Sequence, residues 1–150
     1  MPPQVKTRPS SDDAHEIVYF KRRKANDPAE TIPARKFLRE ECPPKVRAQI
    51  DAVLVAVAAA PPKRFAGGGY WEAMKENMTG WFEVRVNGPQ RRHYRVFCLL
   101  DYDAQGVDKP LLVAITGKSK PFRTELSKAD YAAVKALGDE YLEKPERSLA

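Results

Sequence analysis

The segment Leu111–Ile115 is an uninterrupted run of apolar residues. A strand with one face in water alternates apolar and polar side chains, so this run predicts a central strand that is covered on both faces. The segment Gly117–Lys120 comes just after it and contains two lysines. We therefore expect the strand to deliver basic residues to an exit loop at the edge of a sheet.

Two segments before this strand have the two-residue period of half-buried strands. Apolar side chains alternate with charged ones in 81–86 and again in 91–98, and Asn87–Pro89 between them has the composition of a turn. These features predict a β-hairpin. If the apolar sides of both strands share one core, the opposite face carries Arg85, His93 and Arg95.

The remaining elements follow from helical spacing, prolines and capping residues. The sequence predicts a strand at 16–20, helices at 31–41 and from Lys45 to Pro61–Pro62, one or two helical turns at 71–78, and a last helix that begins at Ser127. Ser127 and Asp130 have the spacing of a capping box. The expected fold is α+β, with an N-terminal strand, an αα-hairpin, a three-stranded antiparallel meander and a C-terminal helix packed on one sheet.

Length and composition indicate one domain. The chain has 150 residues, of which 43% are hydrophobic and 31% charged, which is typical of a globular domain. We place the domain at residues 15–143, with flexible tails at 1–14 and 144–150. The glycine-rich segment 65–69 is expected to be a linker, and the polar segment 101–109 a solvated connection.

Several classes of protein are disfavoured. Cys42 and Cys98 lie too far apart in the sequence for a metal-ligand cluster and form no disulfide framework, so both are expected to be reduced structural thiols. The polar, proline-rich start has no secretory signal, and no apolar run is long enough to cross a bilayer. These features favour a cytoplasmic protein without a membrane partner.

Positive charge is concentrated in the middle of the chain. The net charge is +6, and between Lys63 and Arg95 seven Lys or Arg residues stand against three Glu residues. Such a local excess favours a polyanionic partner.

The order of the elements and three short motifs resemble the RelE/ParE superfamily of bacterial toxin–antitoxin systems, most closely its HigB-like, often phage-derived, branch. The motifs are Trp81–Val86, Tyr94–Phe97 and Ile115–Lys120, and the resemblance covers roughly Glu16 to Tyr141. It implies a RelE-like fold and a compact toxin that enters the ribosomal A site and cleaves messenger RNA. It also implies an antitoxin protein that binds and silences the toxin.

Cleavage of this kind begins when the RNA 2′-hydroxyl attacks the adjacent phosphorus. It needs a base, an acid and cations that stabilise the phosphoryl oxygens, and it requires no metal or small-molecule cofactor. The resemblance matches Arg85 and Arg95 to the strand arginines of the family, and Lys118 and Lys120 to its basic residues after the last strand. His93 is the obvious titrating group, and Glu83 is a weaker candidate for the base. The predicted catalytic residues are Arg95, Arg85, His93 and Lys118, and the predicted RNA-binding residues are Lys120, Arg91, Arg92, Lys75 and Arg123.

Other interpretations stay open. Arg85 could simply pair with Glu83, and Tyr131 in the last helix could be a core residue or could reach the site. No tyrosine or histidine follows Tyr141, where many relatives have a functional one, so the acid and the base are not assigned. The alternative functions are a non-catalytic inhibitor that binds a host protein, such as a gyrase poison or a phage host-takeover protein, and an RNA-binding accessory protein.

Overall fold

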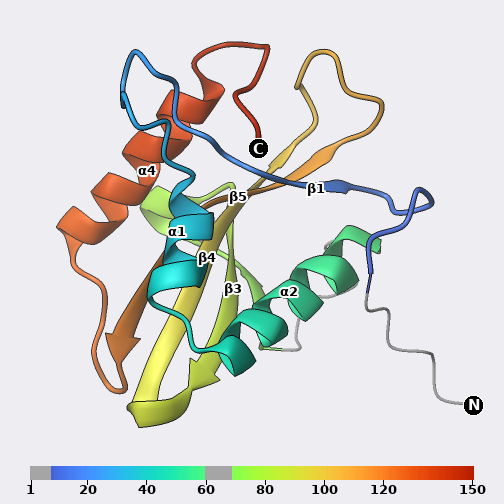
Figure 1. Cartoon of the computed structure of the whole chain (residues 1–150). Helices are drawn as coiled ribbons and strands as arrows, with labels where there is room; N and C mark the ends of the chain where they lie inside the picture. Colours follow the sequence, from blue (N-terminus) through green and yellow to red (C-terminus); the bar gives the residue numbers. More distant parts are fainter. Residues whose placement is uncertain (1–7, 60–68) are drawn as a thin grey trace, which may run out of the picture.

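The computed structural model describes residues 8–59 and 69–150, which form an α+β fold (Figure 1). The strands are β1 (Glu16–Tyr19), β2 (Trp71–Ala73), β3 (Trp81–Gly88), β4 (Arg92–Asp101) and β5 (Leu111–Pro121). The helices are α1 (Pro33–Glu40), α2 (Pro44–Ala59) and α4 (Lys128–Leu142), with short 3-10 helices η1 (Glu76–Met78) and η2 (Pro89–Arg91). The predictions for Pro61–Pro62, Lys63, Arg64 and most of the glycine-rich segment lie outside the described residues.

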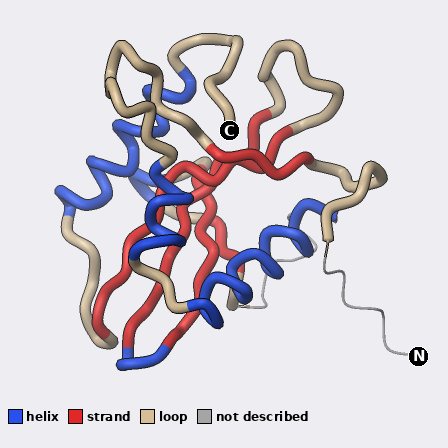
Figure 2. Tube along the Cα trace, viewed as in Figure 1, coloured by secondary structure: helices blue, strands red, loops and turns tan. Residues whose placement is uncertain are grey.

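The strands form one five-stranded sheet in the order β1-β5-β4-β3-β2. The meander β3-β4-β5 is antiparallel, as predicted, and β1 joins it as a parallel neighbour of β5 (Figure 2). The expectation of helical turns at 71–78 is wrong for its first part, because β2 begins at Trp71 and pairs with β3. The Trp71 ring stacks on Phe82, with the ring centroids 5.0 Å apart, and this contact favours the extended conformation.

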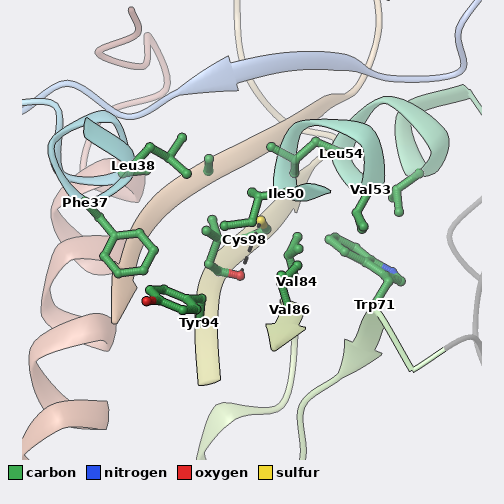
Figure 3. Packing of buried hydrophobic residues seen from close by; sticks show 14 of the residues in the cluster. Phe37, Leu38, Ile50, Val53, Leu54, Trp71, Val84, Val86, Tyr94 and Cys98 are labelled. Carbon is green, nitrogen blue, oxygen red and sulfur yellow. Dashed lines mark hydrogen bonds between the residues drawn. The ribbon is translucent and has the colours of Figure 1, made fainter. Parts of the chain in front are cut away.

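Helices α1 and α2 cover one face of the sheet (Figures 1 and 3). Phe37 and Ile50 from these helices pack against Val84, Val86 and Tyr94 from the strands. Helix α4 covers part of the other face, where Val134 and Tyr141 join a second cluster of buried side chains. The predicted central strand is confirmed, since all of Leu111–Ile115 is buried between these two layers.

Helix α4 begins as the sequence predicts and approaches the sheet closely. The Ser127 hydroxyl accepts a hydrogen bond from the Asp130 amide, and the Asp130 carboxylate accepts one from the Ser127 amide, which completes the capping box. Gly138 lies directly on Trp81: a Cβ atom at this position would come within 2.2 Å of the indole ring. The absence of a side chain therefore lets α4 pack against the sheet.

A β-bulge in β5 determines which way its basic end faces. Phe97 pairs with Thr116 and Cys98 with Ala114, so Ile115 is the extra residue. Before the bulge, odd-numbered residues face α4; after it, Gly117 lies against Phe37 of α1. The side chains of Lys118 and Lys120 consequently lie on the α4 side of the sheet.

The end of the chain lies against the domain. The Ala150 amide donates to the Tyr19 carbonyl at 2.8 Å, and Arg147 forms an ion pair with Asp101 at 2.9 Å. The Tyr141 hydroxyl also donates to Asp101, at 2.7 Å. The expectation that Asp101 belongs to a solvated connection is therefore wrong. Asp101 ends β4, is 4% exposed, and accepts hydrogen bonds from these two side chains and from the Asp103 amide.

We expect Arg147→Met to lower the free energy of unfolding by about 3 kcal/mol at neutral pH, because it leaves a buried carboxylate without its cation. Burial alone would raise the pKa of Asp101, but hydrogen bonds from Arg147 and Tyr141 lower it overall. The stabilisation by the ionised form is therefore present above the ordinary carboxyl pKa and is lost as the pH falls through the lowered one. The difference between variant and wild type should shrink at acid pH.

Urea unfolding at several pH values measures this effect. Arg39→Met is the matched control, because Arg39 and Glu40 form an exposed pair at 3.9 Å that contributes little. Equal losses of unfolding free energy in the two variants would show that the pair of Arg147 and Asp101 contributes no more than an exposed pair.

Candidate functional site

Strand register brings the basic residues of β3, β4 and β5 into two adjacent rows. Arg85 lies opposite Arg95, and Arg95 lies opposite Lys118. In the next row, His93 lies between Asn87 and Lys120. The predicted common face of Arg85, His93 and Arg95 is thus confirmed, and it is the α4 face.

Arg95 is the most buried cation of this group, with 5% of its surface exposed. Its Nη1 donates to the Tyr94 carbonyl at 3.1 Å. Burial lowers the pKa of Arg95, while the negative charge of Glu83 acts in the opposite direction. A guanidinium keeps its charge even so, because its ordinary pKa is above 12.

Arg85 is partly neutralised by acidic neighbours. Its Nε lies 3.5 Å from a Glu83 oxygen, and its Nη1 lies 3.7 Å from a Glu72 oxygen. The pairing of Arg85 with Glu83, left open by the sequence, is therefore present. The Nε atom is buried and has no hydrogen-bond acceptor with suitable geometry among the described residues, so Arg85 keeps unused donor capacity.

These side chains surround a hollow of about 340 Å³, which we call the Arg95 hollow. It is lined by Glu83, Arg85, Arg95, Lys120, Glu125, Leu126 and Tyr131. Burial raises the pKa of Glu83, and the charges of Arg95, Arg85 and Lys120 oppose this shift. The hollow thus combines three cations with two carboxylates, of which Glu83 accepts a proton more readily than an exposed glutamate does.

Three lining residues, Glu125, Leu126 and Tyr131, come from outside the strands. Tyr131 lies in the first turn of α4, and the sequence left its position open between core and site. Glu125 lies in the segment between β5 and α4 and was not recognised from the sequence. The sequence signal for their position is the short connection between Lys120 and the capping residue Ser127, which keeps the start of α4 near the basic end of β5. In the structure, Lys118 Nζ lies 3.8 Å from Asp130 of α4.

His93 lies beside the Arg95 hollow, in a neighbouring hollow that Arg85 and Arg95 also line. Its Nδ1 lies 2.6 Å from Asn87 Oδ1 and its ring stacks on Phe122, with centroids 4.4 Å apart. Because the amide oxygen only accepts, Nδ1 carries the proton and Nε2 is the free acceptor. Burial, followed by the charges of Arg95, Lys120 and Arg85, lowers the pKa of His93 and favours its neutral form.

The expected exit loop is instead part of a strand. Lys118 and Lys120 belong to β5, which continues to Pro121 because β4 pairs with it along this length. Burial, together with the charge of Arg95, lowers the pKa of Lys120. A lysine in this position gives up its proton more readily than an exposed one.

The other predicted RNA-binding residues do not line the Arg95 hollow. Arg91 is exposed in the β3–β4 connection, and Arg92 donates to Ser119 at 3.0 Å. Arg123 is exposed beyond the end of β5, and Lys75 lines a separate hollow beside α4. Arg92 points to the α1 and α2 side of the sheet, where it lines a hollow with Glu40 and Tyr94, so it lies on the face opposite Arg95. Its predicted place beside Arg95 is therefore wrong, because neighbouring residues of a strand face opposite ways.

The two cysteines take no part in the site. Cys42 and Cys98 are buried and form no disulfide, and burial raises the pKa of Cys42 to about 12. Within residues 8–59 and 69–150, no group of three His, Cys, Asp or Glu side chains is arranged to hold a metal ion. In the same part of the chain, no helix has the length and apolar character that crossing a membrane requires.

Comparisons with protein-family models, with curated proteins and with solved structures gave no match.

We expect Arg95→Gln to raise the pKa of Glu83 further, because it removes the cation that most strongly opposes the effect of burial. Carboxyl-carbon NMR of the folded protein over a pH series measures this pKa. Arg123→Gln is the control, since Arg123 does not line the hollow. A Glu83 pKa unchanged in Arg95→Gln would show that the two groups are not coupled.

Proposed function

We propose that this protein is an RNA-cleaving toxin of the RelE type, which cuts messenger RNA on the ribosome. The observation that carries the proposal is the Arg95 hollow, in which Arg85, Arg95 and Lys120 surround Glu83. Rigid guanidinium groups bind phosphate oxygens in a fixed geometry, and a carboxylate with a raised pKa is suited to proton transfer.

The arrangement supplies each group that the reaction needs. Glu83 takes the proton of the 2′-hydroxyl, whose oxygen attacks phosphorus while the bond to the 5′-oxygen breaks. Arg95 and Arg85 stabilise the charge on the phosphoryl oxygens, and Lys120 donates a proton to the leaving 5′-oxygen. The products are a 2′,3′-cyclic phosphate and a 5′-hydroxyl.

The catalytic roles proposed for Glu83, His93 and Lys118 differ from those predicted from the sequence. Glu83 becomes the favoured base because it lies in the same hollow as Arg95 and Lys120, whereas His93 lines the neighbouring hollow. Lys118 becomes a phosphate-binding residue, because its partner Asp130 holds it near the α4 N-terminus. His93 contacts the nucleotide on the other side of the two arginines.

The architecture also supports the proposal. The order of strand, two helices, antiparallel meander and final helix is the order expected from the family resemblance. The proposal includes the ribosome and messenger RNA as partners, an antitoxin protein that covers the basic face, and a cytoplasmic site of action. β2 and η1 add a segment next to the Arg95 hollow, where the sequence predicted helical turns and no strand.

We expect Arg95→Lys to reduce RNA cleavage by about a hundredfold or more, because a lysine keeps the charge but loses the two-pronged donor geometry. The measurement maps new 5′ ends in transcripts after the protein is induced in a bacterial host. Wild type should stop growth and leave cuts within translated messages, and Arg95→Lys should do neither. Thermal unfolding of the purified variant verifies that it is folded, and Arg39→Lys on exposed α1 should behave like wild type.

Other outcomes would contradict the proposal. Growth arrest by wild type without new 5′ ends would favour an inhibitor that binds a host protein. Binding of RNA that weakens steeply with salt, without arrest or cuts, would favour an RNA-binding accessory protein. Cleavage that is unaffected by Arg95→Lys would remove the Arg95 hollow from the mechanism.

A further inference from the structure

The hollow that Lys75 lines, of about 620 Å³, lies between the segment 72–78 and the first turns of α4. We call it the Met74 hollow. It is lined by Glu72, Ala73, Met74, Lys75, Glu76, Asn77, Met78, Glu83, Lys128, Tyr131, Ala132 and Lys135. Its volume is in the range of small-ligand sites, about 300–1,000 Å³.

The Met74 hollow differs from the Arg95 hollow in its chemistry. Met74, Met78, Tyr131 and Ala132 supply apolar surface, whereas arginine is absent from its lining. The lysines of the lining are matched by an equal number of glutamates, so there is no excess of positive charge to hold a phosphate. Flexible methionine side chains and a tyrosine ring are suited to a flat, neutral ring.

The two hollows are adjacent. Glu83 and Tyr131 line both of them. A ligand with an anionic group beside Arg95 and Lys120 can therefore extend past Tyr131 into the Met74 hollow. A nucleotide has this combination of a phosphate and a flat heterocycle with polar edges.

The polar groups around the Met74 hollow can also contact the edge of a base. Glu72 and Glu76 offer acceptors for amino groups, and Asn77 offers both a donor and an acceptor. The same carboxylates repel a phosphate, which makes the base and not the backbone the suitable occupant.

We propose that the Met74 hollow binds the nucleobase next to the phosphate held in the Arg95 hollow. The inference rests on the proposed function, and it names a base-binding site in the segment formed by β2, η1 and α4. Single-stranded RNA is thus bound at two chemically different places, with Tyr131 between them. The base in the Met74 hollow gives the protein a contact that a bare phosphate chain lacks.

Ala132→Leu tests this proposal, with Ala136→Leu as its matched control. Both alanines are exposed on α4, but only Ala132 lines the Met74 hollow, so neither leucine enters the core. The probes are two fluorescent tetranucleotides, a 2′-O-methyl RNA that cannot be cleaved and an abasic chain with the same phosphates. Wild type should bind the RNA more tightly than the abasic chain.

We expect Ala132→Leu to weaken binding of the RNA by about tenfold, as for the loss of one stacked base. Binding of the abasic chain should not change, and Ala136→Leu should bind both probes like wild type. Thermal unfolding of each variant verifies that the fold is intact.

Three results would overturn the inference: equal binding of RNA and abasic chain by wild type, unchanged binding of RNA by Ala132→Leu, or an equal loss for both probes. Arg95→Lys separates this failure from that of the proposed function. If it weakens both probes while Ala132→Leu weakens neither, the phosphate site stands and the base site is wrong. If Arg95→Lys also changes nothing, the phosphate site is wrong as well.

Discussion

The β-bulge at Ile115 is the constraint on which the arrangement of the basic residues depends. Without the extra residue, the alternation of β5 would point Lys118 and Lys120 towards α1 and α2, into an apolar layer. With it, both lysines lie on the same face as Arg85 and Arg95, beside the N-terminus of α4. Bulges commonly redirect side chains next to functional sites, and this one determines how many cations the site contains.

The strands hold two positively charged side chains close together at the centre of the site. Arg85 and Arg95 lie directly opposite each other, an arrangement that is unfavourable without compensation. Glu83 and its strand partner Glu72 both contact Arg85 and supply part of that compensation. An anionic ligand would complete it, so the electrostatics of the fold favour phosphate binding in the Arg95 hollow. In the proposed mechanism, Glu83 is also the proton acceptor.

Local pattern was enough to predict some of this structure and not the rest. Alternation placed Arg85, His93 and Arg95 on one face because the side-chain period of a strand holds wherever the strand is regular. Alternation did not predict which way the side chains of β5 point after Ile115, since a bulge leaves no distinct pattern in a single sequence. It also missed the contacts of Asp101 with Arg147 and left open whether Tyr131 reaches Glu83, because these residues are distant in the chain and meet only when α4 packs on the sheet.

The most direct test of the account follows the arginine side chains during RNA binding. NMR signals of the Nε–H groups are recorded while the protein is titrated with the uncleavable 2′-O-methyl tetranucleotide. The account predicts that the signals of Arg85 and Arg95 shift together and saturate, while those of Arg39 and Arg47 on the α1 and α2 side stay in place. Shifts confined to Arg39 and Arg47 would show that RNA binds the opposite face and would contradict the account.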